Sequence, residues 1–286
     1  MYRVLMCVAA ALFIGNQAVA QEKVSFPSTD GDLKGVPTTI TGYLYKPAGS
    51  GPFAAVVGMH GGDGLVDEKG GIHPMYGQWG EILSSKGYLV LLVDSFQPRG
   101  YGSIDEGPIG GFPVLPNREM PRDAFGGMNY LRSRPDVRSN SIAILGQSYG
   151  GAATLFTIAN GALPKDVPPE KDFRAAIALY PGCIRIQDAY WRPRQPMLLL
   201  MGESDDFGSL ARCKEFIAHA EGGPPIDAHF YPNTYHAFDH PNLPSRVVTN
   251  VKIPPDGHSP TVGSNPEARA DAINRVTQFL AKQLPQ

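Results

Sequence analysis

Ser148 is the residue whose setting points most clearly to chemistry. It stands at the centre of the pentapeptide GQSYG at residues 146–150, between an apolar run and a run of small residues. The G-x-S-x-G spacing is typical of a sharp, strained turn that joins a strand to a helix and lifts the serine hydroxyl above the sheet edge. Glycine is needed on both sides because a side chain there would collide with the neighbouring strand or helix. The pattern predicts a nucleophilic serine.

A serine hydroxyl is a weak nucleophile, so a base must take its proton and an acid must orient that base. Downstream of Ser148, Asp205 follows one apolar run and His236 follows a later one. This is the chain order serine, acid, histidine that α/β-hydrolases use. We expect His236 to be the base and Asp205 to orient it. Asp206 and Glu203, in the same turn as Asp205, are alternative acids.

Hydrolysis at a carbonyl also needs two N–H groups that stabilise the oxygen as it becomes negative. One should come from the amide of Tyr149, directly after the serine. The other should come from the His60-Gly61-Gly62 turn, and we expect the Gly62 amide to supply it. The alternative is a tight turn that binds nothing.

A metal site is a competing interpretation of the loop that carries the base. His240 follows His236 by four residues and, with Asp239, could mimic a metal-binding cluster. One loop, however, offers too few well-spaced ligands for zinc. We therefore expect neither a metal ion nor another cofactor.

The elements that must position these residues alternate between strand and helix. Apolar or alternating runs predict strands at residues 38–45, 53–59, 88–93, 141–145, 175–180, 197–201 and 228–231. Helical spacing predicts helices at residues 75–86, 122–134, from 151 onward, 210–220 and 266–284. The alternation predicts the α/β-hydrolase fold, a mostly parallel central sheet with helices on both faces, in a single domain over residues 21–286. Each predicted catalytic residue would then follow the carboxyl end of a strand.

Composition narrows the possible partners. The 286 residues carry a net charge of −2 with scattered basic residues, which argues against binding to nucleic acid or to an anionic membrane. The Gly/Pro-rich segment 97–121 is expected to be either a functional pocket wall or a passive surface loop. Residues 247–265 are expected to form a long loop. A small molecule is the expected binding partner, and the oligomeric state stays open.

The N-terminus has the pattern of a secretory signal peptide over residues 1–20. Arg3 precedes an apolar stretch at residues 4–14, and Ala18-Val19-Ala20 is an A-x-A cleavage site. The apolar stretch is too short to span a bilayer, which needs about 20 residues. We expect cleavage after Ala20 and a periplasmic or secreted protein without membrane attachment; an uncleaved interfacial anchor is the alternative.

Cysteine usage agrees with export. Cys7 lies in the expected signal peptide, which leaves Cys183 and Cys213 in the mature chain. An even count in an oxidising compartment favours a disulfide, although two separate buried thiols would also satisfy the sequence.

With these residues placed, the chain resembles the dienelactone hydrolase family of α/β-hydrolases. The resemblance rests on residues 57–62, 94–100, 146–151, 179–183, 202–206 and 236–238. It implies a cofactor-free hydrolase that acts on a carboxylic ester or lactone. The chain departs from the namesake enzymes, which use a cysteine where Ser148 stands and a glutamate where Gly61 stands. They also bind a substrate carboxylate with arginines, and here Arg99 is the candidate.

Arg99 has a structural alternative, since it could pair with Asp94, Asp105 or Asp123 to hold its loop. The function expected from the sequence is that of a secreted serine esterase with a Ser148-Asp205-His236 triad. Two other functions are alternatives. A peptidase of the prolyl oligopeptidase type shares fold and triad, and a non-catalytic binding protein could use the same fold.

Overall fold

A single mixed sheet dominates the protein and decides where its loops meet. The computed structural model describes residues 21–107, 111–165, 167–183, 191–207, 210–220, 222–251 and 256–284. Within these ranges the sheet has eight strands in the order β1-β2-β4-β3-β5-β6-β7-β8. The strands are β1 Gln21–Pro27, β2 Thr39–Tyr45, β3 Phe53–Met59, β4 Tyr88–Asp94, β5 Val137–Gln147, β6 Ala175–Leu179, β7 Met197–Gly202 and β8 Ile226–Tyr231.

The direction of the strands confirms the predicted α/β-hydrolase architecture. The pairs β1–β2 and β2–β4 are antiparallel, and the pairs from β4 through to β8 are parallel. All seven residues of β4 are buried, as expected of a strand covered on both faces. Because the parallel strands all point the same way, the loops after β3, β5, β7 and β8 meet at one edge of the sheet.

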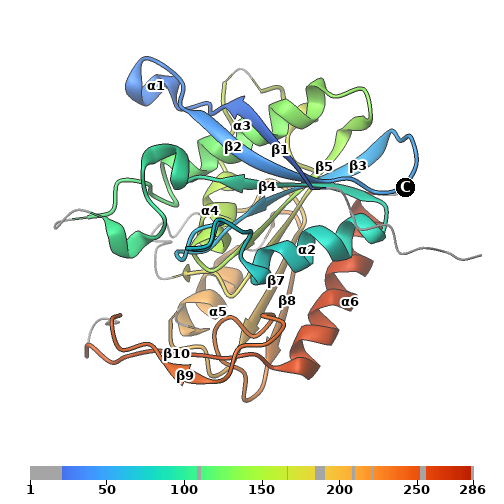
Figure 1. Ribbon diagram of the computed structural model, residues 1–286. Helices are drawn as coiled ribbons and strands as arrows, with labels where there is room; N and C mark the ends of the chain where they lie inside the picture. The colour runs from blue at the N-terminus through green and yellow to red at the C-terminus, as the bar shows by residue number, and fades with distance from the viewer. Residues whose placement is uncertain are drawn as a thin grey trace, which may run out of the picture.

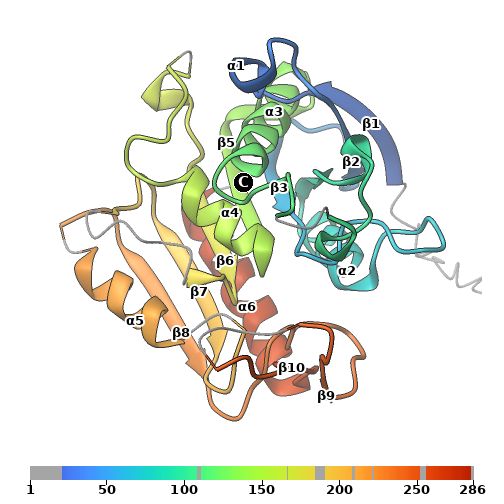
Figure 2. The same ribbon diagram turned by 90° about the vertical axis from the view of Figure 1, so that its left-hand side faces the viewer.

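Helices cover both faces of the sheet, as Figures 1 and 2 show. The helices α2 and α6 lie on one face, and α3, α4 and α5 lie on the other. Their bounds are α1 Gly31–Lys34, α2 Pro74–Ser85, α3 Glu119–Ser133, α4 Tyr149–Thr157, α5 Leu210–His219 and α6 Pro266–Gln283. Short 3₁₀ turns are η1 Gln97–Arg99, η2 Ile104–Glu106 and η3 Pro169–Lys171.

Most predicted elements appear within a few residues of their expected bounds, and β1 is the main addition. Only Val24 and Phe26 of β1 are buried, so its apolar pattern is too sparse to stand out in the sequence. The segment expected to be a long loop also holds a small two-stranded sheet, β9 Arg246–Val247 and β10 Thr261–Val262. The predicted signal peptide at residues 1–20 lies outside the described residues.

A disulfide joins Cys183 to Cys213, which confirms the predicted pairing. The bond connects the loop after β6 to α5, with the two Cα atoms 5.2 Å apart. The helices that the structure describes include none with the length and hydrophobicity needed to cross a membrane.

Candidate active site

The turn around Ser148 has the strained geometry that its glycines predict. Ser148 joins β5 to α4 with φ 52° and ψ −113°, a conformation that L-residues rarely adopt. A Cβ atom at Gly146 would collide with the carbonyl oxygen of Gly150, and one at Gly150 would collide with that of Met59. These contacts are with backbone, so only glycine fits either position. The turn therefore presents the serine where the loops of the sheet edge meet.

Ser148, His236 and Asp205 form a continuous chain of hydrogen bonds. His236 Nε2 lies 2.8 Å from Ser148 Oγ, and His236 Nδ1 lies 2.8 Å from Asp205 Oδ2. An ionised carboxylate can only accept, so Nδ1 carries the ring proton and Nε2 is left to accept from the serine hydroxyl. The Asp205 side chain is completely buried and that of His236 is only 8% exposed. The arrangement is that of a nucleophile, a base and the acid that orients the base.

The alternative acids lie elsewhere. Asp206 Oδ1 accepts from the Thr261 amide at 2.9 Å, so this carboxylate supports the strand β10 rather than His236. Glu203 is exposed in the turn that follows β7. The structure therefore places Asp205, and neither rival, against His236.

Two aromatic rings enclose the imidazole of His236. The Phe207 ring stacks on it with centroids 4.5 Å apart, and the Tyr180 ring meets it edge-on at 4.6 Å. Rings on two sides limit the rotation of the imidazole. Neither residue was anticipated from the sequence, because no local pattern shows which rings will meet the histidine.

The predicted oxyanion turn lies beside Ser148. A Cβ atom at Gly61 would be 3.4 Å from that of Ser148, which places the turn after β3 alongside the serine. The Gly61 amide donates to Tyr76 Oη at 2.8 Å, whereas the amide of Gly62 has no hydrogen-bond acceptor among the described residues. Tyr149 is the first residue of α4, so its amide lies at the positive end of the helix dipole. This geometry is compatible with Gly62 and Tyr149 as the two donors.

The imidazole of His60 stabilises that turn through two hydrogen bonds. The Ser95 amide donates to His60 Nε2 at 3.1 Å, so Nδ1 carries the proton and donates to the Gly61 carbonyl at 2.7 Å. With 1% of its surface exposed, His60 is a structural residue of the turn.

The guanidinium of Arg99 faces carboxylates of the protein itself, which favours its structural alternative. Its guanidinium makes two hydrogen bonds of 2.8 Å to Asp123 and one of 3.0 Å to Asp30, and its side chain is only 6% exposed. Burial raises the pKa of Asp123, although the Arg99 guanidinium opposes this rise. Arg99 is thus held by carboxylates and tethers the loop after β4 to α3, which is the structural alternative.

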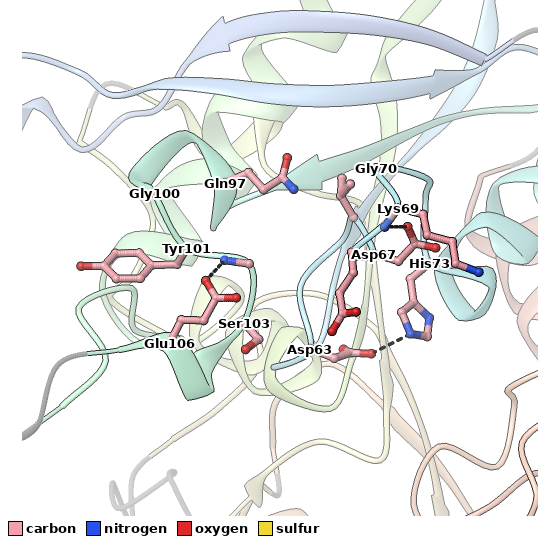
Figure 3. A pocket seen from close by; sticks show the side chains of 13 residues that line it. Asp63, Asp67, Lys69, Gly70, His73, Gln97, Gly100, Tyr101, Ser103 and Glu106 are labelled. Atoms are coloured by element: carbon pink, nitrogen blue, oxygen red, sulfur yellow. Dashed lines mark hydrogen bonds and ion pairs between the residues drawn. The ribbon is translucent and has the colours of Figure 1, made fainter.

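A cavity of about 800 Å³ opens next to the His60-Gly61-Gly62 turn. Residues 63–73 form one wall and residues 97–106 the other, and Figure 3 shows their side chains around the space. Asp63, which directly follows Gly62, lines it, whereas the three residues of the hydrogen-bonded chain do not. Its charged lining residues are the carboxylates Asp63, Asp67, Glu68 and Glu106 with one lysine, Lys69. Part of the segment 97–121, expected to be either a pocket wall or a passive surface loop, therefore lines a pocket.

In the loop that carries His236, the side chains of Asp239 and His240 have different partners. The carboxylate of Asp239 is completely buried and accepts hydrogen bonds from Trp79, Gln147 and Tyr180. His240 lies apart from it against His73, and burial lowers the pKa of His240. No group of three or more potential metal ligands occurs in the part of the chain that the structure describes.

Comparisons with known proteins find a matching family and a related esterase. The model of the dienelactone hydrolase family matches residues 40–284. Esterase EstD of Thermotoga maritima is 32% identical over 137 residues, a match that spans 46% of this chain and 29% of the esterase.

Solved structures show the same fold at low sequence identity. A dienelactone hydrolase-like promiscuous phosphotriesterase from metagenomic libraries superposes with a TM-score of 0.65 at 18% identity, over 92% of this chain and 99% of its own. Dipeptidyl peptidase 4 of Porphyromonas gingivalis gives a TM-score of 0.62 at 18% identity, over 92% of this chain but only 35% of the peptidase.

Proposed function

We propose that this chain, which belongs to the dienelactone hydrolase family, is a serine esterase. It would hydrolyse a carboxylic ester or lactone through an acyl-enzyme. The observation that carries the proposal is the hydrogen-bonded chain from Ser148 through His236 to Asp205 at a strained strand–helix turn. A serine in this setting has both the base and the orienting acid that nucleophilic attack requires.

In the proposed first half-reaction, Ser148 Oγ attacks the carbonyl carbon while its proton passes to His236 Nε2. Asp205 holds the imidazole in the Nδ1–H tautomer and stabilises the imidazolium that forms. The tetrahedral intermediate collapses, and the leaving alcohol takes the proton from His236. In the second half-reaction, water loses a proton to His236, attacks the acyl carbon and releases the acid together with free Ser148.

The amides of Gly62 and Tyr149 are the proposed donors to the carbonyl oxygen while it is negative. Removing one such donor typically costs about 3–4 kcal/mol of transition-state stabilisation. The backbone at Gly146 and Gly150 packs closely against neighbouring backbone atoms. This packing supports the role, because it leaves the turn little freedom to move.

Charge favours a neutral substrate over the anionic lactone of the family's namesake enzymes. Arg99 is occupied by Asp30 and Asp123, so it is not available for a substrate carboxylate. The cavity beside Gly62 carries four carboxylates against one lysine, and this excess of negative charge repels anions. We therefore propose an ester or lactone without a free carboxylate.

Labelling with a fluorophosphonate probe and a panel of esters tests the function directly. The wild-type protein should react with the probe at Ser148 and turn over short neutral esters, and Ser148→Ala should do neither. A protein that hydrolyses esters equally well after Ser148→Ala would rule out the serine mechanism.

A peptidase function is the second candidate, since the dipeptidyl peptidase 4 structure shares the fold. The discriminating measurement compares an ester with the aminoacyl amide of the same acyl group. We expect the ester to be hydrolysed faster by a wider margin than its greater chemical reactivity explains; amide turnover at a matching rate would favour the peptidase.

Export completes the proposal. The A-x-A pattern before Gln21 and the Cys183–Cys213 disulfide both support a protein that folds in an oxidising compartment. N-terminal sequencing of the protein from its native host should find Gln21 as the first residue, whereas an intact Met1 would contradict cleavage.

A further inference from the structure

We infer that Asp239 is a positioning residue, whose buried side chain fixes the nucleophile turn against the loop that carries the catalytic histidine. The inference rests on the proposed serine hydrolase function and assigns a role to a residue whose side-chain hydrogen bonds go to neither Ser148 nor His236. Asp239 and its three side-chain donors, Trp79, Gln147 and Tyr180, are called the Asp239 cluster below.

The cluster joins four segments that are distant in the chain. Asp239 Oδ2 accepts from Trp79 Nε1 of α2 at 2.6 Å and from Gln147 Nε2 at the end of β5 at 2.8 Å. Asp239 Oδ1 lies 2.6 Å from the hydroxyl of Tyr180, directly after β6. Asp239 itself belongs to the loop after β8, so one carboxyl group links these elements.

Two of these links lead straight to the proposed catalytic residues. Gln147 is the neighbour of Ser148 in the chain, so its bond to Asp239 restrains the strained turn from its strand side. Tyr180 presents its ring edge to the imidazole of His236, with centroids 4.6 Å apart. Asp239 follows His236 by three residues and therefore holds the histidine loop from within.

The backbone of Asp239 is fixed as well. Gln78 Nε2 donates to the Asp239 carbonyl at 2.5 Å, and Gln78 Oε1 accepts two hydrogen bonds from Arg269 of α6. The loop is thus anchored through both its side chain and its main chain to the two helices on one face of the sheet. Such anchoring matters because the Ser148–His236 contact joins two segments that only the tertiary structure brings together.

The chemistry of the donors explains why an aspartate suits this position. Trp79 Nε1 and Gln147 Nε2 can only donate, so Oδ2 must accept twice. The Tyr180 hydroxyl can either donate or accept, so a donor N–H or O–H could stand where Asp239 Oδ1 lies. The position therefore requires hydrogen-bond acceptors at a fixed place more than it requires a negative charge.

A pair of substitutions at Asp239 separates these requirements. Asp239→Ala removes every acceptor, and we expect kcat to fall about 100-fold, because a misplacement of about 1 Å costs that much, while KM changes less than about threefold. Asp239→Asn can keep an oxygen toward Trp79 and Gln147 and turn its amide toward Tyr180. It should restore kcat to within about fivefold of the wild type. Rates are normalised to the sites that a fluorophosphonate titrates, so unfolded protein does not count.

A matched pair of hydroxyl deletions covers the case in which Asp239→Ala does not fold. Tyr180→Phe removes a 2.6 Å donor to Asp239, and Ser28→Ala removes a 2.6 Å donor to Asp123, which is also completely buried. The two changes should lower Tm similarly. Only Tyr180→Phe should lower kcat, by about fivefold.

Three outcomes would overturn the inference. Asp239→Ala with wild-type kcat per titrated site would do so, and so would equal kcat for Tyr180→Phe and Ser28→Ala. A wild-type protein that neither hydrolyses esters nor reacts with the probe would overturn the proposed function together with the inference. Normal Ser148-dependent turnover combined with either of the first two results would overturn the inference alone.

Discussion

Two buried carboxylate clusters hold loops in this protein, and they do so by different means. The Arg99 cluster consists of Arg99, Asp30 and Asp123 and is built on ion pairs. The carboxyl group of Asp239 instead meets only uncharged donors, and no ion pair to it occurs among the described residues.

The two clusters also differ in what they hold. In the Arg99 cluster a single guanidinium makes all three hydrogen bonds to the carboxylates, and it ties the loop after β4 to α3. In the Asp239 cluster the three donors come from different elements, and two of them, Gln147 and Tyr180, lie next to Ser148 or His236, where small errors in geometry are costly for the rate.

The largest expected effect is a loss of kcat, and it tests whether the chemistry depends on Ser148, which lies beside the Asp239 cluster. Ser148→Ala should lower kcat by at least about 10⁴-fold, because triad members act as a unit, and it should leave Tm nearly unchanged. Steady-state kinetics on a short neutral ester and thermal unfolding provide the two measurements. Retention of more than a hundredth of the activity would place the chemistry elsewhere.

Breaking the Arg99 cluster should affect stability and not rate. Asp123→Ala removes two of the three carboxylate contacts of a buried guanidinium, and we expect the free energy of unfolding to fall by about 3–5 kcal/mol. Urea denaturation measures this loss. Turnover per titrated site should stay within about twofold of the wild type; a larger fall would mean that the Arg99 cluster also positions the site.

Substrate charge should sharpen the assignment of Arg99. Of two esters alike except for a terminal carboxylate, the neutral one should have a kcat/KM about tenfold higher, since the cavity is acidic and Arg99 is occupied. Glu106→Gln removes one negative charge from the cavity lining. It should lower the ratio of the two kcat/KM values by about twofold. Preference for the anionic ester would restore Arg99 as a binding residue.

The smallest expected effect is a difference in pH dependence between Asp30 of the Arg99 cluster and Asp239. Burial raises the pKa of Asp30, but hydrogen bonds from Thr38 and Arg99 outweigh it, so the pKa lies below the usual 3.8. Burial raises the pKa of Asp239 above 3.8, although its donors oppose the rise. Asp30 therefore stabilises the fold above pH 3.8 and loses this contribution as the pH falls, whereas Asp239 contributes below 3.8 and loses its contribution as the pH rises.

Wild-type, Asp30→Asn and Asp239→Asn proteins, unfolded in urea between pH 7 and pH 3.5, test these signs. The stability of the wild type relative to Asp239→Asn should increase as the pH falls. Its stability relative to Asp30→Asn should decrease toward the acidic end. Parallel curves would contradict the opposite shifts.

The features that the sequence predicts well are local ones. The G-x-S-x-G turn needs only five adjacent residues, and its crowding follows from backbone sterics alone. The meeting of Ser148, Asp205 and His236 follows from one further fact, that parallel strands end at the same sheet edge.

The features that escaped prediction depend on partners far along the chain. Arg99 meets Asp30 across 69 positions, and Asp239 meets Trp79 across 160. No periodicity in the sequence links such residues, so a buried Arg99 cannot be told from an exposed one before the fold is known. The strand β1 was missed for a simpler reason, since only two of its residues face the core.

Turnover should depend on whether the Cys183–Cys213 disulfide has formed in a given preparation. Cys183 lies three residues after Tyr180, so the bond fixes to α5 the same stretch that presents the tyrosine ring to His236. Protein made in a reducing cytoplasm would lack this disulfide. The ring of Tyr180 would then be held less firmly against His236, although every residue of the proposed triad is present. Batches produced by different routes should then differ in turnover per titrated site until the cysteines are oxidised.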